Sequence, residues 1–160
     1  MWWAPVGAGG ASGGGGRRVL GIAAREADII SVNPNLNAGA VTPEVAQDMS
    51  AERVAEKIGW IEEAAKEAGR DPGEIELQVG IFLCRITDSA EEAKVAIENV
   101  ASMFSADPQQ VAESPAILVG SLEQCVEILN ARRERYGISY VTLGGDVTAA
   151  APLVARLAGT

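Results

Sequence analysis

The chain has 160 residues, 48% of them hydrophobic, and carries a formal net charge of −9. This length fits one domain or part of one, and the apolar content is ample for a core, which excludes an intrinsically disordered protein. The acidic balance argues against a nucleic-acid surface and against an anionic membrane as the partner.

The residue types also restrict the chemistry of any site. The chain has no histidine, and its two cysteines, Cys84 and Cys125, are far apart in the sequence. These counts predict neither a disulfide framework nor a metal site. No basic segment precedes an apolar stretch at the N-terminus, and no apolar run approaches the length of a membrane span. We therefore expect a cytoplasmic protein.

The N-terminal segment contains a short apolar stretch, Met1–Val6, followed by several glycines. The apolar stretch is too short to predict a strand, and glycine-rich sequence is typical of leaders and linkers. We expect residues 1–12 to be an irregular glycine-rich leader without a function, and the folded part to cover residues 13–160.

Four successive glycines, Gly13–Gly16, precede a predicted helix that begins at Arg17. Glycine lets the backbone approach a ligand closely, and the free N–H groups of a helix start attract anions. Gly14, Gly15, Gly16 and Arg17 are therefore candidates for phosphate binding. No Lys-Ser/Thr pair follows the glycines and no Gly-x-Gly-x-x-Gly pattern fits, which excludes a Walker loop and a Rossmann fingerprint. A linker that binds nothing is the alternative.

Apolar residues at helical spacing predict that this first helix continues to Ala27 and packs on one face. Ile29–Val32 follows as a predicted buried strand. The next stretch, Asn33–Gly39, has turn chemistry and is either a substrate contact or an ordinary connector.

A second amphipathic helix is predicted from Thr42 or Ser50 to Ala68, with Gly69 as its end. Alternating apolar residues then predict a strand over residues 75–84. Arg85, close to the end of that strand, is a weak candidate for an active-site contact, and a structural role is favoured for it.

The last third of the chain continues the alternation of helices and strands. We predict a helix from the capping-box-like start Asp88–Glu91 to Phe104, a looped excursion over residues 107–115, a helix from Ser121 to Gly137, a strand over Ile138–Leu143 and a closing helix over Ala149–Leu157. Gly144 and Gly145 either approach a ligand or form a plain turn. This rhythm is typical of an α/β fold with a parallel sheet and right-handed crossovers.

Two parts of the sequence resemble the C-terminal half of the luciferase-like monooxygenases, particularly the deazaflavin (F420)-dependent oxidoreductases. These parts are Gly13–Ile30 with Arg70–Pro72, and Leu118–Gln124 with Tyr136–Val141. The resemblance implies a partial (β/α)8 barrel of the TIM type, comprising roughly the last four βα units. Three predicted strands cannot close such a barrel, because closure needs eight.

The resemblance also implies a function. An oxidoreductase of this class transfers a hydride between F420, or alternatively FMN, and a small organic substrate. This half would supply the cofactor phosphate loop at Gly14, Gly15, Gly16 and Arg17. The resemblance places the catalytic residues mostly in a missing N-terminal half, so we expect this chain alone to be inactive. We expect it to form a homo-oligomer or to pair with that half. The alternative is a non-catalytic binding fragment or a pseudo-enzyme subunit that acts with a partner chain.

Overall fold

The computed structural model describes residues 10–35 and 43–158. The expectations for residues 1–9, for Leu36–Gly39 and for Thr42 lie outside these described residues.

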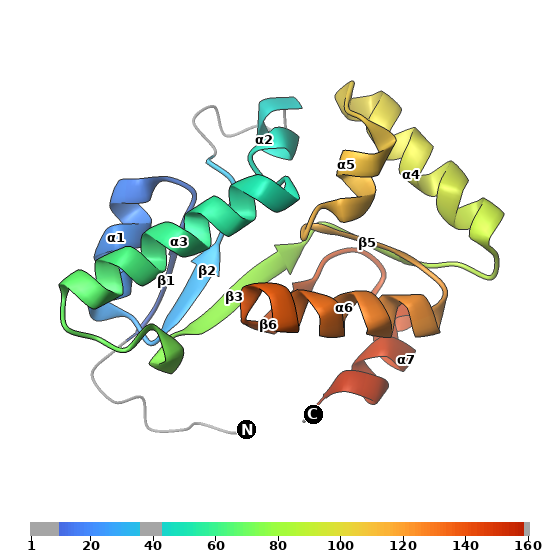
Figure 1. Ribbon diagram of the computed structural model, residues 1–160. Helices are drawn as coiled ribbons and strands as arrows, with labels where there is room; N and C mark the ends of the chain where they lie inside the picture. The colour runs from blue at the N-terminus through green and yellow to red at the C-terminus, as the bar shows by residue number, and fades with distance from the viewer. Residues whose placement is uncertain (1–9, 36–42, 159–160) are drawn as a thin grey trace.

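Four parallel strands form the main sheet, in the order β1-β2-β3-β6 (Figure 1). A second parallel sheet has two strands, β4 and β5. The strands are β1 (Ala11–Gly14), β2 (Ile29–Val32), β3 (Glu76–Ile81), β4 (Leu83–Ile86), β5 (Ile117–Gly120) and β6 (Ile138–Leu143).

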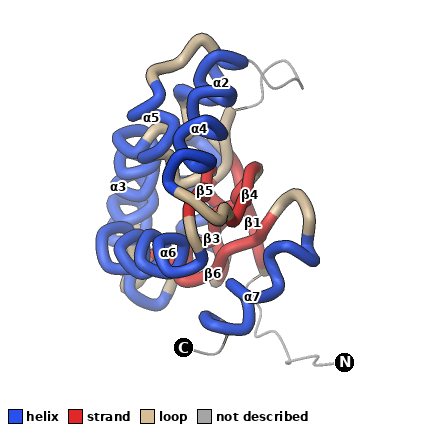
Figure 2. The backbone as a smooth tube through the Cα atoms, turned by 90° about the vertical axis from the view of Figure 1, so that its right-hand side faces the viewer, coloured by secondary structure: helices blue, strands red, loops and turns tan. Residues whose placement is uncertain are grey.

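Helices connect the parallel strands and cover them. Figure 2 shows α3 and α6 on the same side of the strands, and Figure 1 places α2, α4 and α5 beyond the carboxyl ends of β2 and β3. The helices are α1 (Arg17–Glu26), α2 (Pro43–Gln47), α3 (Ala51–Glu67), α4 (Ala90–Phe104), α5 (Pro108–Glu113), α6 (Leu122–Tyr136) and α7 (Val147–Leu157), with a 3-10 turn, η1 (Pro72–Glu74), before β3. This arrangement confirms the predicted α/β class with a parallel sheet. In the described part of the chain, no helix has the length and apolarity needed to cross a membrane.

The main core lies between the sheet and the helices α1 and α3. Leu20 of α1 and Val54 of α3 are fully buried, as are Ile30, Val32 and Val79 of the facing strands. The buried apolar residues of each of these helices recur at helical spacing, and those of β2 and β3 occupy alternate positions, so each element buries one face. A second, smaller cluster forms around Ile81, Leu118, Cys125 and Leu153.

An irregularity in the pairing of β3 with β6 sets which side chains of β6 face the helices. Leu77 pairs with Ile138 and Gln78 pairs with Tyr140, so Ser139 is an extra residue in β6. Such a bulge changes the alternation of the strand. Val141 then packs on the core, and Thr142 lies on the same face as Gln78.

The structure differs from the sequence-based expectation in four elements. The glycine run is partly a strand, because β1 extends over Ala11–Gly14 and pairs with β2. The strand expected over residues 75–84 divides at Phe82 into β3 and β4. The excursion over residues 107–115 contains the helix α5, and β5 was not predicted as a strand.

The barrel is not closed within the described residues. β1 and β6 form the two edges of the main sheet, and the four parallel strands correspond to half of the eight that a TIM-type barrel requires. The fold is therefore consistent with a partial barrel of this type.

Candidate functional site

Three of the four glycines before α1 are required by the packing of the chain on itself. A Cβ atom at Gly13 would lie 2.7 Å from Cβ of Ser31, and one at Gly14 would lie 2.6 Å from Cγ1 of Val19. A Cβ atom at Gly15 would overlap backbone atoms of the loop that follows β2. The run from β1 into α1 is therefore a tight turn that larger residues would force apart.

Gly16, the fourth glycine, has a different environment. It is the N-cap of α1, and a Cβ atom there would meet no other atom within 4 Å. No side chain caps the helix, and its first turn has no acidic residue but begins with Arg17 and Arg18. The first N–H groups of a helix have no intrahelical partners, and here the side chains that adjoin them are cationic. This end of α1 suits an anion.

Arg17 forms an ion pair with Glu63 of α3 in this structure, with 2.7 Å between Nη2 and Oε2. Both side chains are more than half exposed, at 67% and 56%. Exposed pairs of this kind contribute little to stability, so an exchange of Glu63 for an anionic ligand would cost little.

The loop after β2 is held in place by a buried lysine. Nζ of Lys57 donates hydrogen bonds to the carbonyl oxygens of Asn33, at 2.8 Å, and of Asp48, at 2.9 Å, and to Oδ2 of Asp48, at 2.6 Å. The same Asp48 carboxylate accepts a hydrogen bond from the backbone N–H of Asn35, at 2.7 Å. Lys57 and Asp48 therefore fix the loop at two points.

Electrostatic effects act on both members of this pair. Burial lowers the pKa of the Lys57 ammonium, although its contacts with Asp48 oppose that shift. Burial alone would raise the pKa of the Asp48 carboxyl, but the hydrogen bonds from Lys57 and from the Asn35 backbone outweigh it, and the pKa is held below its usual value. The carboxyl is thus ionised at neutral pH.

Pro34, which lies between the two fixed points, and Asn35, which is the second of them, lie directly against Gly15. A Cβ atom at Gly15 would be 2.5 Å from the carbonyl oxygen of Pro34. The Lys57–Asp48 pair therefore also sets where the glycine run can lie, because the loop that it holds is the surface against which Gly15 packs.

A row of polar side chains crosses the sheet on the face opposite the main core. Gln78 on β3 donates a hydrogen bond from Nε2 to Oγ1 of Thr142 on β6, at 2.8 Å, and its Oε1 is hydrogen-bonded to Ser31 on β2. The Ser31 hydroxyl also lies within hydrogen-bonding distance of Oδ1 of Asn33, at 3.2 Å. In a closed barrel this face would point inward.

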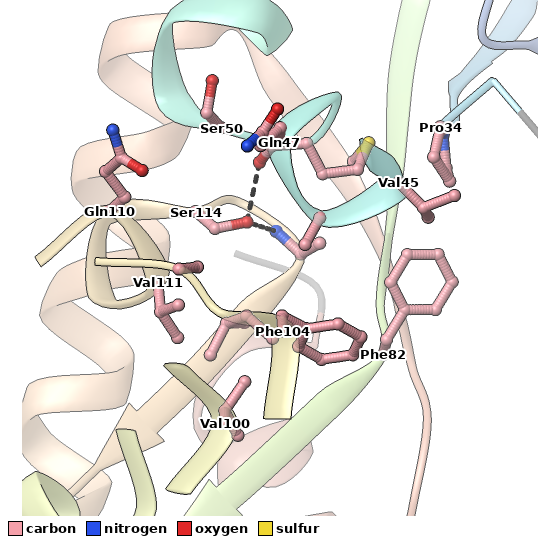
Figure 3. Close-up of a pocket in the computed structure, with 15 residues that line it drawn as sticks. Pro34, Val45, Gln47, Ser50, Phe82, Val100, Phe104, Gln110, Val111 and Ser114 are labelled. Carbon is pink, nitrogen blue, oxygen red and sulfur yellow. Dashed lines mark hydrogen bonds between the residues drawn. The ribbon is translucent and has the colours of Figure 1, made fainter. Parts of the chain in front are cut away.

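A cavity of about 200 Å³ lies beyond the carboxyl ends of β2 and β3 (Figure 3). Its walls come from the loop after β2, from α2, from the junction of β3 and β4, and from α4, α5 and the start of β5. Ligands of parallel α/β sheets bind at this end of the strands. The lining residues are Pro34, Val45, Ala46, Gln47, Met49, Ser50, Phe82, Val100, Phe104, Ala106, Gln110, Val111, Ser114, Ala116 and Ile117.

Of the predicted site residues, Gly14 ends β1, Gly15 and Gly16 connect β1 to α1, and Arg17 is the first residue of α1. Arg85 is exposed on β4, which belongs to the second sheet and not to the sheet that contains β1. Gly144 follows β6, and its backbone N–H donates to the carbonyl oxygen of Ile81 on β3, at 2.7 Å. In the described ranges, no group of three or more Cys, Asp or Glu residues is placed to hold a metal ion.

Sequence reasoning missed Lys57 and Asp48. A signal for Lys57 was present, because it falls on the apolar stripe of α3 between Val54 and Ile61, where a cation needs a buried partner. The sequence contains no comparable signal that this partner is Asp48.

No protein-family model and no curated protein matches the sequence. The fold, however, matches solved structures. Residues covering 92% of the chain superpose on the coenzyme F420-dependent tetrahydromethanopterin reductase of Methanopyrus kandleri, with 19% identity and a TM-score of 0.59. The same share of the chain matches an F420-dependent secondary alcohol dehydrogenase, with 20% identity and a TM-score of 0.55, and the EDTA monooxygenase of a Chelativorans species, with 12% identity and a TM-score of 0.59.

The chain spans about half the length of these proteins, namely 49%, 46% and 42% of them. At these identities the likeness concerns the fold. The four-stranded parallel sheet with its helices is therefore a fold that this chain shares with about half of each of these oxidoreductases and monooxygenases.

Proposed function

We propose that the chain is part of an oxidoreductase of the luciferase-like class, in which it binds the phosphate of a deazaflavin or flavin cofactor. One observation carries this proposal. The N-terminus of α1 has no capping side chain and no acidic residue in its first turn, it begins with two arginines, and open space lies at Gly16. The match of the fold to F420-dependent enzymes supports the same assignment.

The residues present fit a phosphate group. Gly16 and Arg17 would hold it through the backbone N–H groups of the first turn and the Arg17 guanidinium. Gly14 and Gly15 would shape the turn that brings these groups to the carboxyl end of β1. When bound, F420 or FMN supplies a ring that accepts or donates a hydride, and the protein supplies position and electrostatics. We take F420 as the cofactor and FMN as the alternative.

The test uses Gly16→Asp. Aspartate is a favoured N-cap, so this change should not lower stability, but its carboxylate would occupy the free N–H groups and repel phosphate. We expect at least a tenfold loss of affinity for inorganic phosphate, read from the amide NMR shifts of α1, and for F420 and FMN, read from fluorescence. Gly59→Asp is the matched control, because Gly59 also has open space around it but lies in α3.

The result that would overturn the assignment is unchanged binding in Gly16→Asp. Arg17→Ala should have a smaller and salt-sensitive effect, because a single charged contact on the surface is screened by ions. If neither variant affects any of the three ligands, the glycine run is only a tight connection between β1 and α1.

We further propose that the catalytic unit contains more than this chain, either as a second copy or as another half-barrel. Support comes from the two edge strands, β1 and β6, and from the length of the structures that share the fold, of which this chain covers about half. On this proposal, the groups that face the reactive ring come mostly from the partner.

A further inference from the structure

The cavity between α2, α4 and α5 has walls that are almost wholly apolar. Phe82 follows β3, and Phe104 and Val100 come from α4, with Val111 of α5 on another side (Figure 3). Residues from several elements that are far apart in the sequence contribute to this lining, so the cavity is a product of the tertiary fold and not of one helix surface.

The polar side chains in the lining form hydrogen bonds within the protein or belong to exposed residues. The hydroxyl of Ser114 donates to the carbonyl oxygen of Met49, at 2.7 Å, and accepts from the N–H of Ala116, at 3.3 Å. Oγ of Ser50 accepts from the N–H of Arg53, at 3.3 Å. Gln47 and Gln110 are exposed residues.

No charged side chain lines the cavity within the described residues. A charged ligand would therefore lose its hydration here without gaining a partner, which is strongly unfavourable. An uncharged apolar molecule would instead bury its surface against the aromatic and branched side chains of the walls, which is favourable.

The volume restricts the size of such a molecule. An apolar cavity of roughly 150 Å³ stays dry and accommodates benzene. The cavity described here, at about 200 Å³, is somewhat larger. From its volume, its chemistry and its place at the carboxyl ends of β2 and β3, we propose that it binds an uncharged apolar molecule of the size of a benzene ring with one small substituent. This inference goes beyond the proposed function and does not depend on it.

The experiment titrates toluene into the chain with the side-chain methyl groups observed by NMR. We expect shifts at Val45, Val111 and Ile117 and nuclear Overhauser contacts between these methyl groups and the toluene ring. Benzoate, which has the same ring and a charge, should produce neither. Absence of shifts and contacts with toluene up to its solubility limit would overturn the proposal.

A pair of variants on α4 locates the site. Val100 lines the cavity, whereas Val95 on the same helix is exposed and does not. Val100→Phe should fill the space and weaken toluene binding at least tenfold, and Val95→Phe should leave it unchanged. If Val100→Phe does not fold, the contacts measured in the unmodified chain still decide the question. Equal binding by both folded variants would contradict the proposed location.

The two proposals fail separately. Toluene binding without phosphate binding would overturn the redox assignment and leave this site in place. Phosphate binding without toluene binding would do the reverse. Gly16→Asp, which is aimed at phosphate, should leave toluene binding unchanged.

Discussion

Nζ of Lys57 lies 2.6 Å from Oδ2 of Asp48, and the Lys57 side chain is completely buried. The pair joins the middle of α3 to the turn that precedes it and to the loop after β2. Every hydrogen of the ammonium has an acceptor, because the carbonyl oxygens of Asn33 and Asp48 complete its three hydrogen bonds. Such complete pairing is what makes a buried charge tolerable.

Lys57→Met should therefore destabilise the fold by about 3–5 kcal/mol, because it leaves the Asp48 carboxylate partly buried without its main partner. The double variant Lys57→Met with Asp48→Asn should be more stable than Lys57→Met alone, since it removes the uncompensated charge. Urea unfolding measures both. Lys66→Met is the control, because Lys66 is exposed and its pair with Glu62 is worth little. A loss for Lys57→Met no larger than that of the control would contradict this account.

The same carboxyl should make stability depend on acid. Its pKa is lower in the folded chain than its ordinary value of 3.8, so its contribution is present above pH 3.8 and is lost as the pH falls through the folded value. We expect the stability difference between the unmodified chain and Asp48→Asn to be constant near neutral pH and to shrink below 3.8. Urea unfolding over a series of pH values checks this, and a difference that persists unchanged in strong acid would show the expectation to be wrong.

Arg132 of α6 has a structural role that can be measured. It is 6% exposed, and its guanidinium donates to the carbonyl oxygens of Ser114, at 2.8 Å, Pro115, at 3.2 Å, and Ile117, at 2.7 Å. Burial lowers the pKa of Arg132 to about 10, so the group stays charged at neutral pH.

Arg132→Met should destabilise the chain by on the order of 3 kcal/mol, because two buried carbonyl groups and one partly buried carbonyl group lose their donor. Arg132→Lys should lose less, since an ammonium keeps the charge and some of the hydrogen bonds but lacks the planar fork. Arg25→Met, at an exposed position of α1, is the control. Thermal unfolding in which the three variants melt together would refute this role.

Gly15→Val should impair folding rather than only ligand binding. A side chain there would overlap the backbone of Pro34 and Asn35, which the Lys57–Asp48 pair holds in place. We expect a loss of about 3 kcal/mol, the upper end of the range typical of overpacked sites. Gly16→Val, next to it, should cost much less, because open space surrounds Gly16. Circular dichroism during urea unfolding separates the two, and equal stability of both variants would argue against close packing at Gly15.

The open edges of the main sheet predict association. β1 and β6 have no outer strand in the described residues, and edges of this kind pair readily with other chains. We expect sedimentation velocity to show species larger than a monomer as the concentration rises. Tyr140→Lys, on the exposed face of β6, should reduce this association, whereas Val154→Lys, on α7, should not. A monomer at all concentrations would be evidence against a partner at these edges.

The sequence by itself determined the ends of several helices. Ser50 and Ser121 were expected as helix caps, and each accepts a hydrogen bond from the backbone N–H three residues later. The start of α4 was expected within Asp88–Glu91, where Ser89 is the N-cap. Gly137 was expected to end α6 and has a left-handed backbone, with φ of 70°. These predictions succeed because a cap depends on atoms within one turn of the chain. Gln124 even completes the capping box of α6 with Ser121.

Only the tertiary structure decided the rest of the candidate site. Ala11–Gly14 has almost no intrinsic preference for a strand, and it becomes one because Ile29–Val32 supplies hydrogen-bonding partners beside it. The apolar cavity likewise joins segments that are distant in the sequence. Asp48 is only nine residues from Lys57, but no local sequence pattern identifies it as the partner of this lysine. The physical reason is the range of the forces involved. Capping acts within a turn, whereas strand pairing, burial of a charge and the shape of a cavity depend on which distant segments the core brings together.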